Sequence, residues 1–372
     1  MKRVLLLGGG HSHLEVVRRF GMLPVLNTEI TLVDAEPFST YSGMLPGLIA
    51  GHYEFGDCHI DLARLAQRAG VRFINSRACG LDVTNRRLEL NNGTRIDYDL
   101  LSINAGSTPS TAGITGADHA LAVKPFQPFA HAWNNLIERA RNGDLHSVVV
   151  IGGGAAGVEI LLAMQFRLAQ LAGTRRVDFA LVTDAHCVLP GHNEGVRSAF
   201  ERVLASRGIT VILQARVEHV AAAAVILDGG RRITADAVVL ATGAAAPAWF
   251  ADTALKLDEH GFIAVDDRLR SESHATVFAA GDCASIKDRV YPKSGVYAVR
   301  QAPVLAENLR RTTTAQPLAN YHPQRRALAL ISTGDKYAVA SYGRMALAGV
   351  WAWRWKNYID RKFVRRYNQY LR

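Results

Sequence analysis

The sequence predicts an α/β fold in which a strand, a glycine-rich turn, a helix and a second strand occur twice. The first copy reads VLLLGGGHSHLEVV and is followed by EITLVDAE, and the second reads SVVVIGGGAAGVEILLA (147–163) and is followed by VDFALVTDA. Apolar runs of this length, separated by helical patterns, indicate buried parallel strands in βαβ units. Each copy also has a later apolar strand that ends in a small-residue turn, at 97–109 and at 235–247.

The composition is that of a globular protein with more than one domain. The 372 residues exceed one typical core, and 49% hydrophobic against 20% charged residues exclude a disordered chain. No apolar stretch approaches the roughly 18 residues of a membrane span, and the apolar run after Arg3 is too short for a signal peptide. We therefore expect a cytoplasmic protein, with any membrane contact peripheral and on the inner face.

The cysteines and the net charge exclude several other classes. Four cysteines stand far apart without a C-x-x-C pair: Cys58, Cys79, Cys187 and Cys283. This spacing provides neither a zinc ribbon nor a local redox disulfide, predicts no metal site and suggests a reducing compartment. A net charge of +10 suits nucleic acid, an anionic membrane or anionic cofactors. Because the sequence contains no nucleic-acid module and the basic excess lies at the C-terminus, nucleic acid is not an expected partner.

The two glycine turns have the pattern of a pyrophosphate-binding site. Glycines let the backbone approach a pyrophosphate, and the following helix N-terminus offers free N–H groups and a favourable dipole. The second turn has all three glycines of G-x-G-x-x-G, whereas the first has His13 in the third place. The third glycine normally lets helix and strand pack closely, so His13 should push the first helix away or turn its ring out of the contact. Two such units predict two bound dinucleotides.

An acid at the end of the next strand is the usual partner of the adenosine ribose. Asp34 ends the strand of the first unit, at about the expected distance of roughly 20 residues from the glycines. In the second unit, Thr183 aligns with Asp34, and Asp184 follows one residue later. An acid there would repel the 2′-phosphate of NADPH, so Asp184 favours NADH.

Taken together, the segments GGG (8–10), INAGS, GGGAAG, LATG and VFAAGDCA, with Asp34, resemble the FAD-dependent pyridine nucleotide-disulfide oxidoreductase superfamily over nearly the whole chain. The resemblance implies two Rossmann-like domains of the glutathione-reductase type, the second inserted into the first. By it, residues 1–116 and 261–320 form a split FAD-binding domain, 117–260 form an NAD(P)H-binding domain, and 321–372 form a short C-terminal region.

The chain lacks the redox disulfide of the disulfide reductases, because TYSGMLPGLIAGHY (40–53) contains no C-x4-C. It therefore resembles the branch that holds type II NADH dehydrogenases, sulfide:quinone oxidoreductases and apoptosis-inducing-factor-like proteins. The sequences GGGHSHLEV, YSGMLPGLIAGHY, PKSGVYAVRQAP and WKNYIDRKFVRRY are most similar to a bacterial group found fused ahead of selenophosphate synthetase.

The resemblance also implies site residues. Those expected at FAD are Gly8, Gly10, His11, Ser12, Asp34, Tyr41, Pro46, Ala105, Gly106, Gly281, Asp282 and Ala298. Those expected at NAD(P)H are Gly152, Gly154, Ala156, Gly157, Asp184, Thr242 and Gly243. Three residues are candidates for the chemistry: Glu159 beside the nicotinamide, and Lys293 and Tyr297 at the start of the helix that would face the flavin.

Several of these assignments have simpler alternatives. His11 either contacts the cofactor or bonds to the backbone, and Lys293 either neutralises a reduced flavin or acceptor or is a surface lysine. Tyr41 and Pro46 either line the flavin pocket or only pack within a loop. Lys124 lies where the chain crosses into the second domain, and this position favours a hinge role over a chemical one. Cys283 is expected to be a buried small residue rather than a nucleophile.

The predicted activity is hydride transfer from NAD(P)H to FAD and electron transfer from FAD to an acceptor, with a quinone as the best candidate. Only Gln301 remains of the glutamines that type II NADH dehydrogenases place toward the quinone. One alternative is an oxidoreductase acting on a reduced sulfur or selenium compound. Another is a flavin-bearing redox sensor that changes partners. A homodimer is compatible with each.

The C-terminal segment 351–372 predicts a basic helix with an aromatic stripe. Residues recurring every four positions form the stripe: Trp351, Trp355, Ile359, Phe363, Tyr367 and Leu371. Arg354, Arg361, Lys362, Arg365 and Arg366 lie mostly elsewhere on the helix. This is the pattern of an interfacial membrane anchor, and the alternative is that the stripe packs on the flavin domain.

Overall fold

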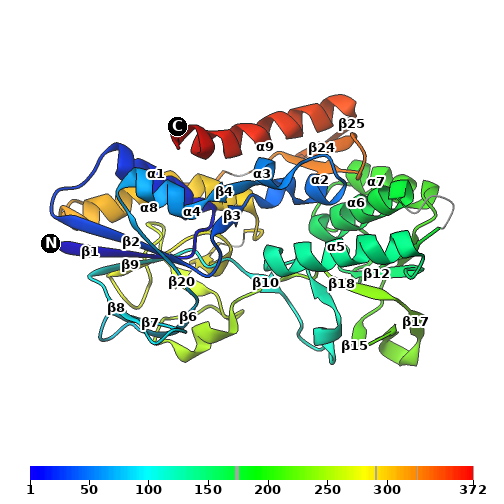
Figure 1. Ribbon diagram of the computed structural model, residues 1–372, viewed down its shortest axis with the longest axis horizontal. Helices are drawn as coiled ribbons and strands as arrows, with labels where there is room; N and C mark the ends of the chain where they lie inside the picture. Colours follow the sequence, from blue (N-terminus) through cyan, green and yellow to red (C-terminus); the bar gives the residue numbers. More distant parts are fainter. Residues whose placement is uncertain (172–175, 290, 325, 372) are drawn as a thin grey trace.

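Two parallel five-stranded sheets form the frame of the protein in the computed structural model, which describes residues 1–171, 176–289, 291–324 and 326–371 (Figure 1). Arg325 and Arg372, which belong to the predicted C-terminal region, lie outside the described residues. The first sheet has the order β21-β9-β1-β2-β5. Its strands are β1 (Lys2–Leu7), β2 (Thr28–Asp34), β5 (Arg72–Asn75), β9 (Leu100–Ile103) and β21 (Val277–Ala279).

The second sheet repeats this plan with the order β11-β18-β12-β13-β14. Its strands are β11 (Leu121–Ala122), β12 (Ser147–Ile151), β13 (Asp178–Val182), β14 (Thr210–Ile212) and β18 (Ala237–Leu240). All of these strands precede β21, which returns to the first sheet. The predicted insertion of the second unit into the first is therefore confirmed, and the residue boundaries of the domains stay predictions.

Helices cover one face of each sheet, and an antiparallel ribbon covers the other (Figure 1). The helices are α1 (His11–Met22), α4 (Leu62–Ala69) and α8 (Gly295–Thr313) on the first sheet, and α5 (Phe126–Asn142), α6 (Ala155–Leu171) and α7 (Glu194–Ser206) on the second. The ribbons are β6 (Ala78–Asp82), β7 (Arg87–Leu90) and β8 (Arg95–Asp97), and β15 (Val217–Ala221), β16 (Ala224–Leu227) and β17 (Arg232–Thr234). Strands buried between two such layers are apolar on both sides, which explains the uninterrupted runs VLLL and VVVI.

Short elements complete the first domain and the crossings between the two domains. They are β3 (Phe38–Thr40), α2 (Leu45–Ile49), α3 (Phe55–Cys58), β4 (His59–Asp61), β10 (Thr108–Pro109), β19 (Ala244–Ala245), β20 (Ile263–Val265) and β22 (Ala284–Ile286). The two chain crossings between the domains meet where β10 pairs antiparallel with β19.

The C-terminal region bridges both domains. It consists of β23 (Ala329–Ser332), β24 (Ala338–Tyr342), β25 (Met345–Gly349) and α9 (Val350–Tyr370). The Asn193 side chain of α7 donates to the carbonyl of Gly343 at 3.0 Å, which attaches the small sheet to the second domain. Arg361 of α9 pairs with Asp57 of the first domain at 2.8 Å. Figure 1 shows α9 (red) lying across the helices of both domains.

One part of the aromatic stripe of α9 packs on the first domain, and the other part is exposed, as a membrane anchor would require. Phe363 and Tyr367 are buried, and the Tyr367 hydroxyl lies 3.4 Å from Glu15 of α1. Trp351 and Trp355, one and two turns into the helix, are 46% and 43% exposed. The C-terminal half therefore packs on the first domain, whereas the N-terminal half presents its rings to the surface.

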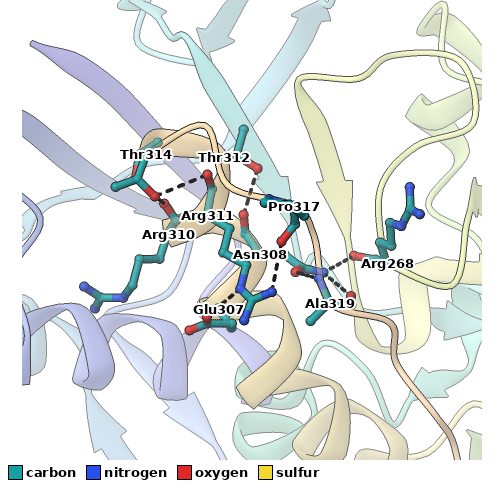
Figure 2. Close-up of polar contacts among 10 residues, drawn as sticks. Arg268, Glu307, Asn308, Arg310, Arg311, Thr312, Thr314, Pro317 and Ala319 are labelled. Carbon is teal, nitrogen blue, oxygen red and sulfur yellow. Dashed lines mark hydrogen bonds and ion pairs between the residues drawn. The ribbon is translucent and has the colours of Figure 1, made fainter.

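The C-terminal end of α8 is held by a fully buried asparagine (Figure 2). The Asn308 amide nitrogen donates to the carbonyls of Arg268 and Ala319 at 2.8 Å each, and its oxygen accepts from the Ala319 N–H at 2.8 Å. These bonds fix the turn from which the chain leaves the first domain.

Replacing Asn308 with alanine is expected to lower the free energy of unfolding by about 3 kcal/mol, because three hydrogen bonds of roughly 1 kcal/mol each are lost and buried backbone groups stay unpaired. Asn308→Asp should destabilise at least as much, because it places a buried carboxylate against the carbonyls of Arg268 and Ala319. Urea unfolding followed by tryptophan fluorescence measures both, with the exposed Asn92→Ala as control. An Asn308→Ala protein as stable as the wild type would contradict this role.

Candidate functional site

The first glycine turn packs directly on the end of β9. Gly8 has a φ of +93°, and a Cβ on it would lie 2.5 Å from the carbonyl oxygen of Asn104. Gly10 is packed against the side chain of the same asparagine. Gly8 therefore requires glycine because of both its positive φ and the close approach, and Gly10, with a φ of −67°, because of the close approach alone.

Asn104 is a buried residue that the sequence pattern did not identify. Its side-chain oxygen accepts from the backbone N–H groups of Ser12 and His13 at 3.1 and 3.4 Å, and its amide donates to the Ala280 carbonyl at 2.6 Å. The Ser12 hydroxyl in turn donates to the carbonyl of Ala298 on α8 at 2.8 Å. The only signal in the sequence is a polar residue inside an apolar strand end, INAGS.

His13 stays inside the contact between helix and sheet. It is fully buried, with Nδ1 2.6 Å from the Gly8 carbonyl oxygen and Nε2 2.8 Å from the Ser102 hydroxyl on β9. The expectation that the ring turns out of the contact is therefore wrong. The imidazole fits because both of its nitrogens have partners: Nδ1–H donates to the carbonyl, and Nε2 accepts from the hydroxyl.

Burial lowers the pKa of His13 to about 4, although the hydrogen bond to Gly8 opposes the shift. The unfolded chain takes up this proton near pH 6.5, so stability is fully present above pH 6.5 and is lost as the pH falls through 4. We expect a loss of about 3 kcal/mol over this window. His13→Asn should reduce the slope of unfolding free energy against pH, measured by urea unfolding from pH 7 to 4. An unchanged slope would contradict the buried neutral state.

His11 lies where the first glycine turn meets the start of α8. Its ring packs edge-on against Tyr41 at 5.3 Å and Phe363 at 5.6 Å, and its Cε1 lies 3.6 Å from the position of a Cβ on Gly295. The Nε2 atom is buried and has no hydrogen-bond partner among the described residues. Burial lowers the pKa of His11 to about 4, so the ring is neutral. This nitrogen is therefore available to a ligand, and a contact between His11 and the cofactor stays a prediction.

Asp34 closes the first glycine turn at the end of β2. Its carboxylate accepts from the backbone N–H of Gly9 and, at 2.7 Å, from that of Glu36. Burial raises the pKa of Asp34 above its ordinary value, and these two hydrogen bonds oppose the shift.

Gly281 and Asp282 follow β21 and face the same edge of the first sheet. Gly281 has a φ of +75°, and its N–H donates to the side-chain oxygen of Gln301 at 2.6 Å. The side chain of Gln301 is therefore used to hold this turn. Asp282 is paired with Lys124 at 2.9 Å. At the neighbouring β9 turn, Ala105 is exposed and Gly106 has no atom within 4 Å of a Cβ position.

The second glycine turn has the same conformation and is open in front. Gly152 has a φ of +125°, and a Cβ on Gly157 would collide with the Gly152 carbonyl. By contrast, a Cβ on Gly154 or Gly243 would meet nothing within 4 Å. Gly154, Ala156 and Gly243 are exposed. The Thr242 hydroxyl donates to the Ser110 carbonyl at 2.6 Å, which ties this edge to the crossing between the domains.

Thr183 occupies the place that Asp34 has in the first unit. A Cβ on Gly153 would lie 2.9 Å from Thr183, and in the same way a Cβ on Gly9 would lie 3.2 Å from Asp34. Asp184 is the next residue and is exposed. The alignment of Thr183 with Asp34 is therefore confirmed, and Asp184 lies one residue beyond it.

Glu159 belongs to a polar cluster between α6 and the C-terminal region. Its carboxylate accepts from the N–H and the hydroxyl of Ser332 at 2.7 and 2.8 Å. Lys356 of α9 donates to Asp360 at 2.8 Å and to the Gly43 carbonyl at 2.5 Å. Lys356 and Asp360 are largely buried, with side chains 12% and 6% exposed.

The charges of this cluster act on one another. Burial raises the pKa of Glu159, and the Lys356 ammonium opposes that shift. Burial alone would lower the pKa of Lys356, but the carboxylates of Asp360 and Glu159 raise it above its ordinary value. Burial, together with Asp360, raises the pKa of Tyr41. Lys356 is therefore a cation and Tyr41 a neutral phenol at neutral pH.

A narrow pocket opens beside this cluster, between the first domain and the C-terminal region. Its walls include Pro46, His52, Tyr53, Ser332, Trp353 and Lys356. His52 closes one side, because its Nε2 donates to the Gly334 carbonyl at 2.9 Å and its ring packs edge-on against Trp353 at 5.6 Å. The pocket combines aromatic walls with one buried cation.

Lys293 and Tyr297 lie at the start of α8 but are engaged elsewhere. The Lys293 ammonium donates to the Ala284 carbonyl at 2.6 Å and lies 3.9 Å above the Phe262 ring. It is partly buried, so it is not an ordinary surface lysine. The Tyr297 ring packs against Tyr291 at 5.3 Å. A catalytic role for either residue stays a prediction.

The cysteines do not form a reactive pair. All four are free thiols. Cys283 is fully buried, and burial raises its pKa to about 11, so its thiol is protonated at neutral pH. The expectation of a buried small residue at Cys283 is confirmed. Among the described residues, no cluster of side chains with the composition of a metal site is found.

Comparison with known proteins agrees with this architecture. A profile of the family "Pyridine nucleotide-disulphide oxidoreductase" matches residues 2–302. The chain belongs to this family, and relatives named NADH dehydrogenase or NADH dehydrogenase-like support its resemblance to the branch of type II NADH dehydrogenases. It is an oxidoreductase. Its more specific resemblance to the group fused with selenophosphate synthetase stays a prediction.

Individual relatives are distant but cover most of the chain. A "Probable NADH dehydrogenase" of Dictyostelium discoideum is 23% identical over 342 residues, covering 85% of this chain and 75% of the relative. "Demethylphylloquinone reductase NdbB" of Synechocystis is 24% identical over 350 residues, covering 89% and 85%. The solved sulfide:quinone oxidoreductase of Aquifex aeolicus has a TM-score of 0.81 at 20% identity, covering 100% of this chain and 92% of that one. At this identity the structural likeness concerns the fold alone.

Proposed function

We propose that the protein binds FAD in its first domain and NADH in its second, and transfers electrons from NADH through FAD to a quinone. The observation that carries this proposal is the repetition of one pyrophosphate-binding turn at the edges of two parallel sheets. Gly8 and Gly152 both have a positive φ, and both approach the end of the neighbouring strand. When bound, FAD supplies the group that accepts hydride from NADH and passes electrons on.

The residues of the first domain fit FAD. His11 has a buried nitrogen without a protein partner, and Gly106 faces open space. Asp34 would hold the adenosine ribose and Asp282 the ribityl chain. The N-terminus of α8, beginning at Gly295, would favour negative charge on the flavin through its dipole.

The residues of the second domain fit NADH. Gly154 leaves space at the N-terminus of α6, where free N–H groups and the dipole favour a pyrophosphate. Asp184 lies just beyond the ribose position and would repel the additional phosphate of NADPH. Glu159, on the same helix, would help position the nicotinamide, and Ser332 fixes its carboxylate.

The residues that line the pocket beside α9 have side chains that suit a quinone. Trp353, Tyr53 and His52 provide aromatic walls for a flat ring, and the Lys356 ammonium provides a donor for a quinone oxygen as negative charge develops on it. Two of the three proteins compared above carry a quinone in their names.

An anaerobic titration tests this proposal. The purified protein should contain FAD, and one equivalent of NADH should bleach the flavin absorbance, whereas NADPH should need a much higher concentration. Failure of both nicotinamides to reduce the flavin would overturn the proposal. Normal reduction followed by very slow reoxidation with every acceptor would favour the redox-sensing alternative.

The sulfur or selenium alternative lacks a reactive group at the site. Cys283 is buried with its Sγ 3.3 Å from the Ala280 carbonyl oxygen, and Cys187 is buried beside Arg197 at 3.8 Å. Turnover that survives Cys187→Ala and Cys283→Ala would exclude a persulfide mechanism at these residues.

We also propose that the exposed half of α9 contacts an anionic membrane. No helix among the described residues combines the length and the apolar character that crossing a membrane requires. The exposed apolar side chains around the start of α9 include Met345, Leu347, Val350, Trp351, Trp355 and Ile359. Arg354, Lys362, Arg365 and Arg366 are exposed on the same helix. Aromatic rings beside basic side chains match the headgroup region of a bilayer.

Co-sedimentation with vesicles tests this contact. The wild type should bind vesicles of phosphatidylglycerol and phosphatidylcholine, and high salt should weaken the binding. Trp351→Ser with Trp355→Ser should abolish it, whereas Leu26→Ser, which removes an exposed apolar residue elsewhere, should not. Equal binding by the double variant would exclude this surface.

A further inference from the structure

Lys124 lies at the crossing between the two domains, and its charge reaches the edge of the first sheet where FAD is proposed to bind. It follows β11, the edge strand of the second sheet, by two residues. Its ammonium reaches Asp282, which follows β21 of the first sheet, at 2.9 Å. The pair therefore joins the two domains at the end of β21, where a hinge alone would need no such contact.

Three segments converge at this point. The Lys124 ammonium also donates to the Ser107 hydroxyl at 3.3 Å, and that hydroxyl lies 3.4 Å from the same Asp282 oxygen, Oδ2. Ser107 comes from the turn after β9. The Asp282 side chain is only 13% exposed, so its charge requires compensation nearby.

The two oxygens of Asp282 differ in their surroundings. Oδ2 contacts Lys124 and Ser107, whereas Oδ1 has no protein hydrogen-bond partner among the described residues and is not sealed from solvent. One oxygen is thus held in place and the other is free to accept a hydrogen bond from a ligand. A hydroxyl group is the matching donor, because a carboxylate only accepts.

We propose that Lys124 is a positioning residue of the FAD site, which holds Asp282 so that its free oxygen is presented to a hydroxyl of the ribityl chain. This inference rests on the FAD site proposed above. Because Lys124 belongs to the crossing, FAD binding and the placement of the second domain are linked through this pair. The charges of Lys124 and Asp282 also act on His11, which places the pair beside the rest of the site.

The alternative is an ordinary salt bridge at the surface. The Lys124 side chain is 42% exposed, and exposed pairs contribute little to stability. Such a pair would affect neither FAD affinity nor the redox potential of the flavin. These two quantities therefore distinguish the roles.

The test compares Lys124→Met, Lys124→Arg and Ser107→Ala with the wild type. FAD binding to the apoprotein is measured by quenching of flavin fluorescence, and the midpoint potential of the bound FAD by dye equilibration. We expect Lys124→Met to weaken FAD binding about tenfold, the value of one hydrogen bond to a charged group. Its potential should become more negative, because the site loses a positive charge. Lys124→Arg should restore both, and Ser107→Ala should leave the potential unchanged.

Lys256→Met serves as a control, because Lys256 pairs with Glu272 at 2.7 Å with its own side chain 60% exposed. Lys124→Gln replaces Lys124→Met if that variant does not fold. FAD affinity and potential equal to the wild type in the charge-removing variant would overturn the proposal. If FAD affinity and potential fall in Lys124→Met and are equally low in Lys124→Arg, the proposal would also be overturned. The effect would then come from the packing of the lysine side chain and not from its charge. Absence of FAD binding in the wild type would instead refute the proposed function.

Discussion

Gly154→Asp is expected to raise the KM for NADH by a factor of about 100 or more while leaving the fold and the bound FAD intact. A side chain at this position meets no atom within 4 Å, and the residue is exposed. The new carboxylate would point into the space at the N-terminus of α6. There it would repel the pyrophosphate by about 4 kcal/mol, for charges roughly 4 Å apart at an effective dielectric constant near 20.

Stopped-flow reduction of the bound FAD by NADH measures this effect. Gly154→Ala is the matched control, because it adds a Cβ without charge and should have a much smaller effect. The thermal unfolding temperature should be the same in all three proteins, since the variants touch no neighbour. Reduction of Gly154→Asp at the wild-type rate and KM would mean that NADH does not bind at this turn.

Lys356→Met is expected to slow electron transfer to a quinone at least tenfold while slowing reduction by NADH much less. The variant removes the one ammonium among the pocket's wall residues, and a group that stabilises developing charge is typically worth about 3 kcal/mol. It also leaves Asp360 buried without its partner, which should lower the free energy of unfolding by about 3 kcal/mol.

The double variant Lys356→Met with Asp360→Asn separates these two effects. It removes both charges of the Lys356–Asp360 pair, so most of the stability should return, but the slow reoxidation by quinone should remain. Lys362→Met, an exposed lysine on the same helix, should behave as the wild type. Rapid quinone reduction by the double variant would show that the pocket beside α9 is not the acceptor site.

The architecture could be predicted from the sequence because it depends on local patterns. Each glycine turn is flanked by its own strand and helix, so Gly8 and Gly152 could be identified without knowing any distant contact. The position of β21 in the first sheet followed from the order of the motifs. The pairing of Thr183 with the place of Asp34 needed only the strand register.

The contacts that complete the site could not be predicted, because they join residues far apart in the chain. Asn104 holds the start of α1, 92 residues away, and Lys124 reaches Asp282 across 158 residues. The resemblance predicts Glu159 as a site residue, but it gives no sign of the partner Ser332, which lies 173 residues further on. No pattern of spacing marks such pairs.

His13 and α9 show two other reasons for the limits of sequence reasoning. The motif suggests that a bulky ring at His13 disturbs the turn, but the hydroxyl of Ser102 accommodates it. The stripe of α9 is continuous in sequence, yet the first domain covers only Phe363 and Tyr367. Which part of an amphipathic helix is buried depends on how far its neighbours extend.

Sequential-mixing stopped-flow under anaerobic conditions tests the central claim most directly. The protein is first reduced with one equivalent of NADH and is then mixed with a water-soluble quinone, with oxygen or with polysulfide. The proposed function predicts rapid loss of flavin absorbance in the first step, and reoxidation by the quinone that is much faster than by the other two. Absence of reduction by NADH, or reoxidation by polysulfide alone, would contradict it.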